Sequence, residues 1–162
     1  MADRKRSEGP RPQDRPPRNE SESGRRPTDG GECILVIEDN AMNMRLFHDL
    51  LRAQGYQVVE ARDGRSGIDL ARAEIPDLIL LDLQLPDISG LTVAAELKAD
   101  DRTQDIPIVI VTASMPSDAE GAVLESGCDA LLTKPIAIAQ FRSTIASVLK
   151  RRRQGSKREP TV

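Results

Sequence analysis

One run near the middle of the chain sets the class of fold: Asp77-Leu78-Ile79-Leu80-Leu81-Asp82-Leu83-Gln84-Leu85-Pro86-Asp87-Ile88-Ser89-Gly90. Its apolar part is unbroken and is bounded by polar and turn-forming residues, which indicates a strand buried on both faces of a parallel sheet. Asp82 stands at the carboxyl end of this strand. Because ligands of open α/β sheets bind beyond the carboxyl ends of the strands, Asp82 is a candidate for chemistry.

Similar strand patterns recur on both sides of this run, at 33–37, 57–61, 108–111 and 130–133. Helical patterns follow the strands, so five strands alternate with five helices. Right-handed crossovers then place helices on both faces of one sheet. We therefore predict an α/β fold of the flavodoxin-like, doubly wound type, with a five-stranded parallel sheet in the order 2-1-3-4-5 and five helices.

Two of the predicted helices carry details that the structure can test. In the first, over 41–54, the apolar spacing assigns the inward face to Met42, Leu46 and Leu50, broadened by Phe47 and Leu51. The fourth helix is expected from about 116 to 126, and it is weakly apolar.

The two ends of the chain differ in composition from its middle. Residues 1–31 are rich in Pro and Arg and almost free of apolar side chains, so we expect a disordered N-terminal tail. Residues 150–162 are expected to form a second, basic disordered tail, unstructured beyond its first turn. The aliphatic residues lie in 32–149, which is long enough for a single domain with one full core.

The formal charge of −3 hides an uneven distribution of charge. Residues 32–149 hold nineteen acidic against nine basic residues, whereas 150–162 hold six basic residues and one acidic residue. We therefore do not expect the domain to bind nucleic acid, although the C-terminal tail could add weak phosphate affinity. No apolar run reaches membrane-spanning length and the N-terminus lacks a signal peptide pattern, so a cytoplasmic protein without membrane contact is expected.

Five polar residues follow strand ends that the predicted sheet brings to one edge: Glu38, Asp39, Asp82, Thr112 and Lys134. Taken singly, such acids more often cap helices, and a lysine more often pairs with one of them. The complete set favours a site, since three neighbouring carboxylates repel one another unless a cation lies among them. Ligands that offer only oxygen suit a hard ion, and we predict Mg²⁺. Mg²⁺ and an ammonium beside a carboxylate also form a receptor for a phosphoryl group, with Asp82 as the nucleophile.

At these residues the chain resembles the receiver domain of bacterial two-component response regulators. The resemblance covers 32–149 and rests on Glu38-Asp39, on Asp82 followed by Pro86 and Gly90, and on Thr112-Ala113 and Lys134-Pro135. Within that family the chain is most similar to DivK-like single-domain response regulators of the bacterial cell cycle. That likeness rests on Val36-Ile37-Glu38-Asp39-Asn40, Asn43-Met44, Leu46-Phe47-His48-Asp49-Leu50-Leu51, Gln54-Gly55-Tyr56 and Gln84-Leu85-Pro86.

The resemblance implies a role for each residue of the set. Asp82 would accept phosphate from a kinase phosphohistidine, and Asp39, with Glu38 partly through water, would hold Mg²⁺ together with Asp82. Gln84 would lend its backbone carbonyl to the metal. The switch that reads the phosphoryl group would consist of Thr112, Ala113, Lys134 and the residue three positions before the lysine, Leu131.

The chain departs from the family pattern in two places. Receivers commonly have an aromatic residue at the position of Leu131, and its ring turns inward on activation. Whether this chain responds to phosphorylation through that position is therefore open. Pro116, in the loop after Thr112, can stiffen or shorten the fourth helix, so conformational coupling can differ from that of a typical receiver.

The leading prediction is therefore a single-domain response regulator of a phosphorelay, which signals through protein contacts and is not an enzyme. Its expected partners are a sensor histidine kinase or phosphotransfer protein and a downstream protein effector, and a weak homodimer is left open. The alternative is a scaffold or nucleic-acid-associated adaptor that binds through its tails while the receiver core is idle. A phosphatase or hydrolase on the same fold ranks last, because the candidate acids are already committed to the metal.

Overall fold

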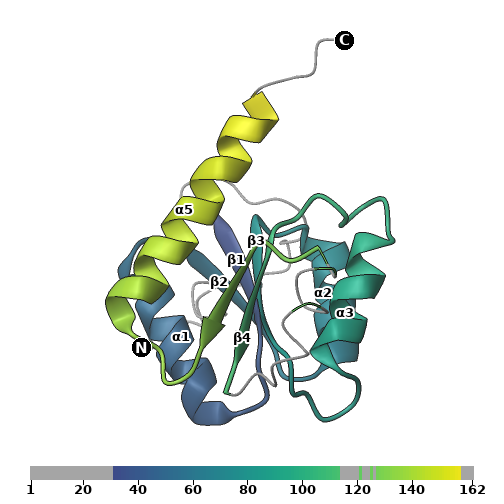
Figure 1. The fold of residues 1–162 in the computed structure, drawn as a ribbon, viewed down its shortest axis with the longest axis horizontal. Helices are drawn as coiled ribbons and strands as arrows, with labels where there is room; N and C mark the ends of the chain where they lie inside the picture. The colour runs from purple at the N-terminus through teal and green to yellow at the C-terminus, as the bar shows by residue number, and fades with distance from the viewer. Residues whose placement is uncertain (1–30, 114–120, 122–124, 126, 158–162) are drawn as a thin grey trace, which may run out of the picture.

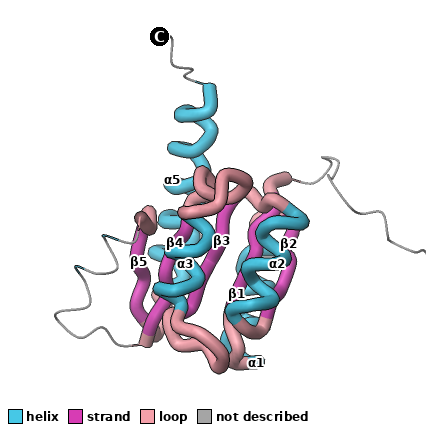
Figure 2. The backbone as a smooth tube through the Cα atoms, turned by 90° about the vertical axis from the view of Figure 1, so that its right-hand side faces the viewer, coloured by secondary structure: helices cyan, strands magenta, loops and turns pink. Residues whose placement is uncertain are grey.

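Five parallel strands form one sheet in the computed structural model, in the order β2-β1-β3-β4-β5 (Figure 1; Figure 2). The structure describes residues 31–113, 121, 125 and 127–157. The observed strand order confirms the predicted doubly wound fold. The strands are β1 (Cys33–Ile37), β2 (Gln57–Ala61), β3 (Leu78–Asp82), β4 (Ile108–Thr112) and β5 (Ala130–Thr133).

Within these residues the structure has four helices: α1 (Ala41–Ala53), α2 (Gly64–Glu74), α3 (Gly90–Lys98) and α5 (Ile138–Lys157). Helices α1 and α5 cover one face of the sheet and α2 and α3 the other (Figure 1). The helix predicted over 116–126 falls largely outside the described residues, so four helices stand where five were expected. None of the helices in the described ranges is long and apolar enough to cross a membrane.

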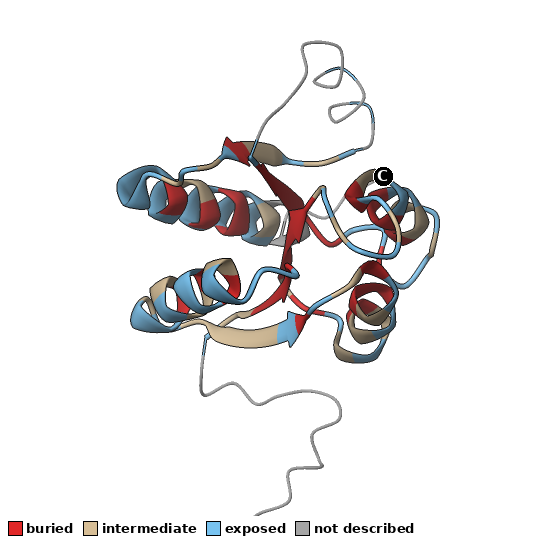
Figure 3. Ribbon diagram, turned by 90° about the horizontal axis from the view of Figure 1, so that it is seen from below, coloured by how far each residue is buried: buried red, intermediate tan, exposed pale blue. Residues whose placement is uncertain are grey.

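The sheet divides the apolar core into two halves. Every residue of β3 and β4 is buried, as their continuous apolar runs predict, and these strands form the centre of the molecule (Figure 3). Side chains alternate along each strand, so Leu80 and Val109 face the α1–α5 layer and Ile79 and Ile108 face the α2–α3 layer. The sheet is thus held from both sides, which fixes the position of its carboxyl edge.

The inward face predicted for α1 is partly wrong. Met42 is 79% exposed and Leu46 is 40% exposed, whereas Met44, Phe47 and Leu51 are the buried residues of the helix. The ring of Phe47 stacks on that of Phe141 from α5, with centroids 5.6 Å apart and an angle of 12° between the ring planes. This long-range aromatic contact orients the helix, because it buries the largest apolar side chain that α1 carries.

The last helix reaches further into the basic tail than expected: the tail from residue 150 was predicted to be unstructured beyond its first turn, and α5 continues to Lys157. Two ion pairs support this basic extension: Arg152 Nη1 lies 3.0 Å from Asp77 Oδ1, and Arg153 Nε lies 3.2 Å from Glu32 Oε2. Basic side chains near a helix C-terminus also interact favourably with the helix dipole. The disorder predicted for 1–31 falls outside the described residues except at Gly31, and stays a prediction.

Candidate functional site

Three carboxylates meet at the carboxyl edge of the sheet. Glu38 and Asp39 follow β1, Asp82 ends β3, and these two strands are neighbours in the sheet. One carboxylate oxygen from each of the three residues lies within 4.8 Å of the other two. Glu38 and Asp82 are buried, with exposures of 1% and 5%, and Asp39 is exposed. The cluster is therefore dense in negative charge and open to solvent on one side.

Among the described residues, one ammonium group faces the two buried acids. Lys134 follows β5, and its backbone N–H donates to the carbonyl oxygen of Thr112 at the end of β4, at 2.9 Å. Its Nζ lies 3.3 Å from Glu38 Oε1 and 3.5 Å from Asp82 Oδ2. One cation beside three carboxylates leaves net negative charge at this edge of the sheet, which favours binding of a further cation.

The first turn of α1 holds the buried carboxylate of Glu38. Its Oε2 accepts hydrogen bonds from the backbone N–H of Asn40, at 3.1 Å, and from Asn43 Nδ2, at 3.5 Å. Burial raises the pKa of the Glu38 carboxyl, and the negative charge of Asp82 raises it further. The Asn40 N–H and the Lys134 ammonium oppose this shift, and the net result is a pKa above the ordinary value.

This raised pKa gives a testable dependence of stability on pH in the absence of divalent cations. A carboxyl whose pKa is higher in the folded state than in the unfolded state contributes most below its unfolded pKa, and that contribution is lost as pH rises through the folded pKa. We expect Glu38→Gln, which stays neutral and keeps an acceptor for Asn40, to be more stable than wild type at neutral pH. The difference should vanish near pH 4.

Urea denaturation of both proteins in a chelating buffer, repeated across the pH range, measures this effect. An exposed control, Asp69→Asn on α2, should show no such pH-dependent gain. A Glu38→Gln protein that is less stable than wild type at neutral pH would contradict the expected sign.

The loop that follows β3 places Gln84 beside the acids. The backbone N–H of Gln84 donates to Asp82 Oδ1 at 3.1 Å, and the N–H of Gly90 donates to the carbonyl oxygen of Leu83 at 2.9 Å. A Cβ atom on Gly90 would overlap the carbonyl oxygen of Asp82, so this close approach requires glycine. Gln84 helps to line a depression of about 480 Å³ together with Glu38, Asp39, Asn40, Ala41, Asn43, Asp82 and Lys134.

The remaining predicted site residues lie on the neighbouring strands. Thr112 is buried at the end of β4, one position beyond Val111, which pairs in register with Asp82. Ala113 follows it and is exposed. Leu131 is half-buried and packs against the core cluster beneath α2 and α3. The structure therefore gathers the acids, the lysine and Gln84 at one depression, with Thr112 at the adjoining strand end and Leu131 half-buried beside the core.

Sequence reasoning missed the polar groups that hold the acids in place. Asn40 and Asn43 were named only within motifs that carry the resemblance, and neither was given a role at Glu38, although both donate to it. An amide residue in the first turn of the helix that follows the acids is a signal that could have found Asn43. Asp87 carried no such signal, because its hydrogen-bond partners are 22 and 23 residues away.

Comparison with known protein families identifies this arrangement. The response regulator receiver domain matches residues 34–146. The chain belongs to the receiver domain family. Receiver domains are signalling proteins that interact with histidine kinases and downstream effectors.

Two relatives of this receiver are bacterial response regulators. The polar-differentiation response regulator DivK of Brucella anthropi is 45% identical over 118 residues, which cover 73% of this chain and 96% of that protein. DivK of Brucella ovis is 44% identical over 118 residues, with the same coverage of both chains. These relatives confirm the predicted likeness to DivK and support a single-domain response regulator in phosphorelay signalling.

Solved receiver structures resemble this one in fold. The receiver domain of a sensor histidine kinase from Pseudomonas aeruginosa PAO1, with a magnesium ion coordinated in its active site cleft, has a TM-score of 0.66 and 30% sequence identity. That match covers 75% of this chain and 96% of the other. The phosphorylated cyanobacterial phytochrome response regulator RcpA has a TM-score of 0.62 and 28% identity, and the match covers 72% and 90%.

Proposed function

We propose that this receiver accepts a phosphoryl group on Asp82 from the phosphohistidine of a sensor histidine kinase or phosphotransfer protein. One observation carries the proposal: Asp82 ends a buried strand among Glu38, Asp39 and the Lys134 ammonium, which lies 3.5 Å from its Oδ2. A carboxylate placed against cationic groups at a concave edge is the arrangement that phosphoryl transfer requires.

The donor set fits Mg²⁺. It offers carboxylate oxygens within 4.8 Å of one another, and Gln84 beside them can add a backbone carbonyl. We assign Asp39, Asp82 and the Gln84 carbonyl as direct ligands, with Glu38 acting partly through water. The magnesium ion in the Pseudomonas receiver supports this assignment. Bound there, Mg²⁺ would neutralise charge on the transferred phosphoryl oxygens.

The chain's own residues would then act in fixed roles. A carboxylate oxygen of Asp82 attacks phosphorus, so an O–P bond forms as the P–N bond to the kinase histidine breaks. The Lys134 ammonium, already 3.5 Å from Asp82, pairs with the new negative charge. The Thr112 hydroxyl and the Ala113 N–H, at the end of β4, are the proposed hydrogen-bond donors to the phosphoryl oxygens.

In this proposal the protein is a phosphoacceptor and switch in the cytoplasm, and it does not turn over a substrate of its own. Leu131, half-buried against the core, replaces the aromatic residue that receivers commonly carry there, so the proposed effector would contact another part of the phosphorylated edge. The tail-based scaffold has less support. Arg152 and Arg153 are engaged with acids of the same chain, which leaves fewer cations for an acidic partner.

Mass spectrometry after incubation with acetyl phosphate and Mg²⁺ tests the proposal. We expect one phosphoryl adduct on the wild type, mapped to Asp82, and none on Asp82→Asn, since an amide is a poor nucleophile. A matched control, Asp69→Asn on the exposed face of α2, should be labelled like the wild type. An unlabelled wild type, or an adduct unchanged in Asp82→Asn, would contradict the proposed function.

A further inference from the structure

The loop from Leu83 to Ser89, which carries Gln84, is fastened at two points. Its base is closed by the hydrogen bond from Gly90 N–H to the Leu83 carbonyl. Its far side is held by Asp87, whose Oδ1 accepts from the backbone N–H of Gly64 at 2.8 Å and whose Oδ2 accepts from that of Arg65 at 2.9 Å. Both carboxylate oxygens of Asp87 therefore bind the first turn of α2.

Helix α2 already has a cap from its own sequence. Asp63 is its N-cap residue, and Asp63 Oδ1 accepts from the backbone N–H of Ser66 at 2.8 Å. Asp87 supplies a second carboxylate from a distant loop to the same helix end. Loss of hydration raises the pKa of Asp87, but the N–H groups of Arg65 and Gly64 outweigh this effect and the pKa lies below its ordinary value. The carboxylate is thus charged at neutral pH and suits the positive end of the helix.

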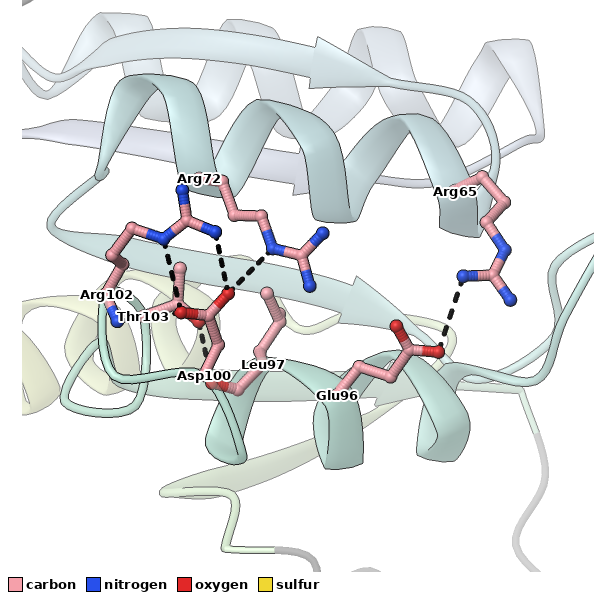
Figure 4. Close-up of polar contacts among 7 residues, drawn as sticks. All are labelled: Arg65, Arg72, Glu96, Leu97, Asp100, Arg102 and Thr103. Atoms are coloured by element: carbon pink, nitrogen blue, oxygen red, sulfur yellow. Dashed lines mark hydrogen bonds and ion pairs between the residues drawn. The ribbon is translucent and has the colours of Figure 1, made fainter.

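The loop and α2 also pack directly against each other. A Cβ atom on Gly64 would lie 2.5 Å from Cγ1 of Ile88 and 3.0 Å from Cγ2 of Val93, so the backbone of α2 touches the loop. Helix α2 is in turn tied to α3 and to the turn after it. Arg65 Nη1 lies 3.4 Å from Glu96 Oε2 and Arg72 Nε 2.8 Å from Asp100 Oδ2 (Figure 4). The anchor of Asp87 is therefore a helix held near both ends.

We infer that Asp87 is a positioning residue for the metal and phosphoryl site: it holds the Leu83–Ser89 loop on α2 and so fixes the Gln84 carbonyl relative to Asp82. This inference rests on the proposed function of the site. The Gln84 N–H donates to Asp82 Oδ1. A mobile loop would therefore change the position of the Gln84 carbonyl relative to the Asp82 carboxylate. A loop held before the ion arrives loses less conformational freedom on binding.

Magnesium titrations followed by amide NMR separate positioning from simple capping, because two carboxylates cap the same helix. Asp63→Ala removes a cap without touching the loop, and Asp87→Ala removes the loop contact as well. Thermal unfolding should show a similar loss of stability in the two variants. We expect Asp87→Ala to bind Mg²⁺ about tenfold more weakly than wild type, as partners of metal ligands typically do when removed. Asp63→Ala should bind Mg²⁺ like the wild type.

Two further readouts sharpen the test. Asp87→Asn keeps one acceptor oxygen, so its affinity for Mg²⁺ should fall between those of wild type and Asp87→Ala. In the wild type, the amide signals of Gly64 and Arg65 should shift on Mg²⁺ addition, and these shifts should disappear in Asp87→Ala. Equal Mg²⁺ affinity in wild type and Asp87→Ala, or equal weakening in Asp63→Ala, would overturn the inference alone. A wild type that binds no Mg²⁺ and takes no phosphoryl group would overturn the proposed function with it.

Discussion

Replacing Gly90 with alanine is expected to destabilise the protein by about 3 kcal/mol, the upper end for overpacking a tight contact. A Cβ atom at this position would overlap the carbonyl oxygen of Asp82 and lie 2.7 Å from the Cα of Leu83. Both are backbone atoms that cannot rotate away, so the strand end and the loop must move apart. Because Asp82 and Gln84 lie on the displaced segment, phosphorylation by acetyl phosphate should be lost even in the fraction that stays folded.

Urea denaturation and the phosphorylation assay, run on the same samples, measure both effects. Gly121→Ala is the matched control, since a Cβ at Gly121 would meet nothing within 4 Å. It should keep the wild-type labelling rate and a denaturation midpoint no lower than that of the wild type, because alanine favours a helix more than glycine does. A Gly90→Ala protein that is labelled at the wild-type rate would show that the loop accommodates a methyl group without moving Asp82.

Replacing Phe47 with alanine is expected to cost about 4 kcal/mol, as other truncations of buried Phe do. Phe47 is 1% exposed and stacks on Phe141, so the substitution opens a cavity between α1 and α5 and removes a ring contact. A loss of this size is a large part of the roughly 5–15 kcal/mol that stabilises a typical domain. The site chemistry should persist at low temperature, because the cavity lies within the core and outside the acidic cluster.

Met42→Ala is the control for this second prediction, because Met42 lies on the same helix with 79% of its surface exposed. Its free energy of unfolding should change by no more than about 0.5 kcal/mol. The opposite ranking, with Met42→Ala the more damaging change, would mean that α1 is rotated relative to the structure.

Structure that depends on a pattern within one strand could be predicted from the sequence. The continuous apolar runs, such as Ile108–Val111, indicated the buried strands, and their alternation with helices indicated a doubly wound parallel sheet, for which 2-1-3-4-5 is a common strand order. The rotation of α1 could not be predicted in this way. Apolar residues lie on two overlapping stripes, one through Met42 and one through Met44, and only contact with Phe141 on a distant helix selects the second.

The same distinction between local patterns and distant contacts applies to the candidate site. Acids at strand ends follow from local pattern and topology, which is why Glu38, Asp39 and Asp82 were predicted to meet, and they do. Contacts between distant parts of the chain could not be predicted in this way. Asp87 binds α2 through backbone N–H groups, which have no sequence signature, and the extension of α5 depends on acids that precede β1 and β3, including Asp77.

The length and anchoring of α5 place its C-terminal end at a fixed distance from the site. The helix has 20 residues, so it spans about 30 Å, and it starts at Ile138, near the end of the sheet that carries Lys134. Its basic end is fixed near Asp77 by Arg152. A fluorescent amino acid at the exposed Gln154 would therefore lie far from Asp82, and energy transfer to a dye on a kinase could report docking without obstructing it.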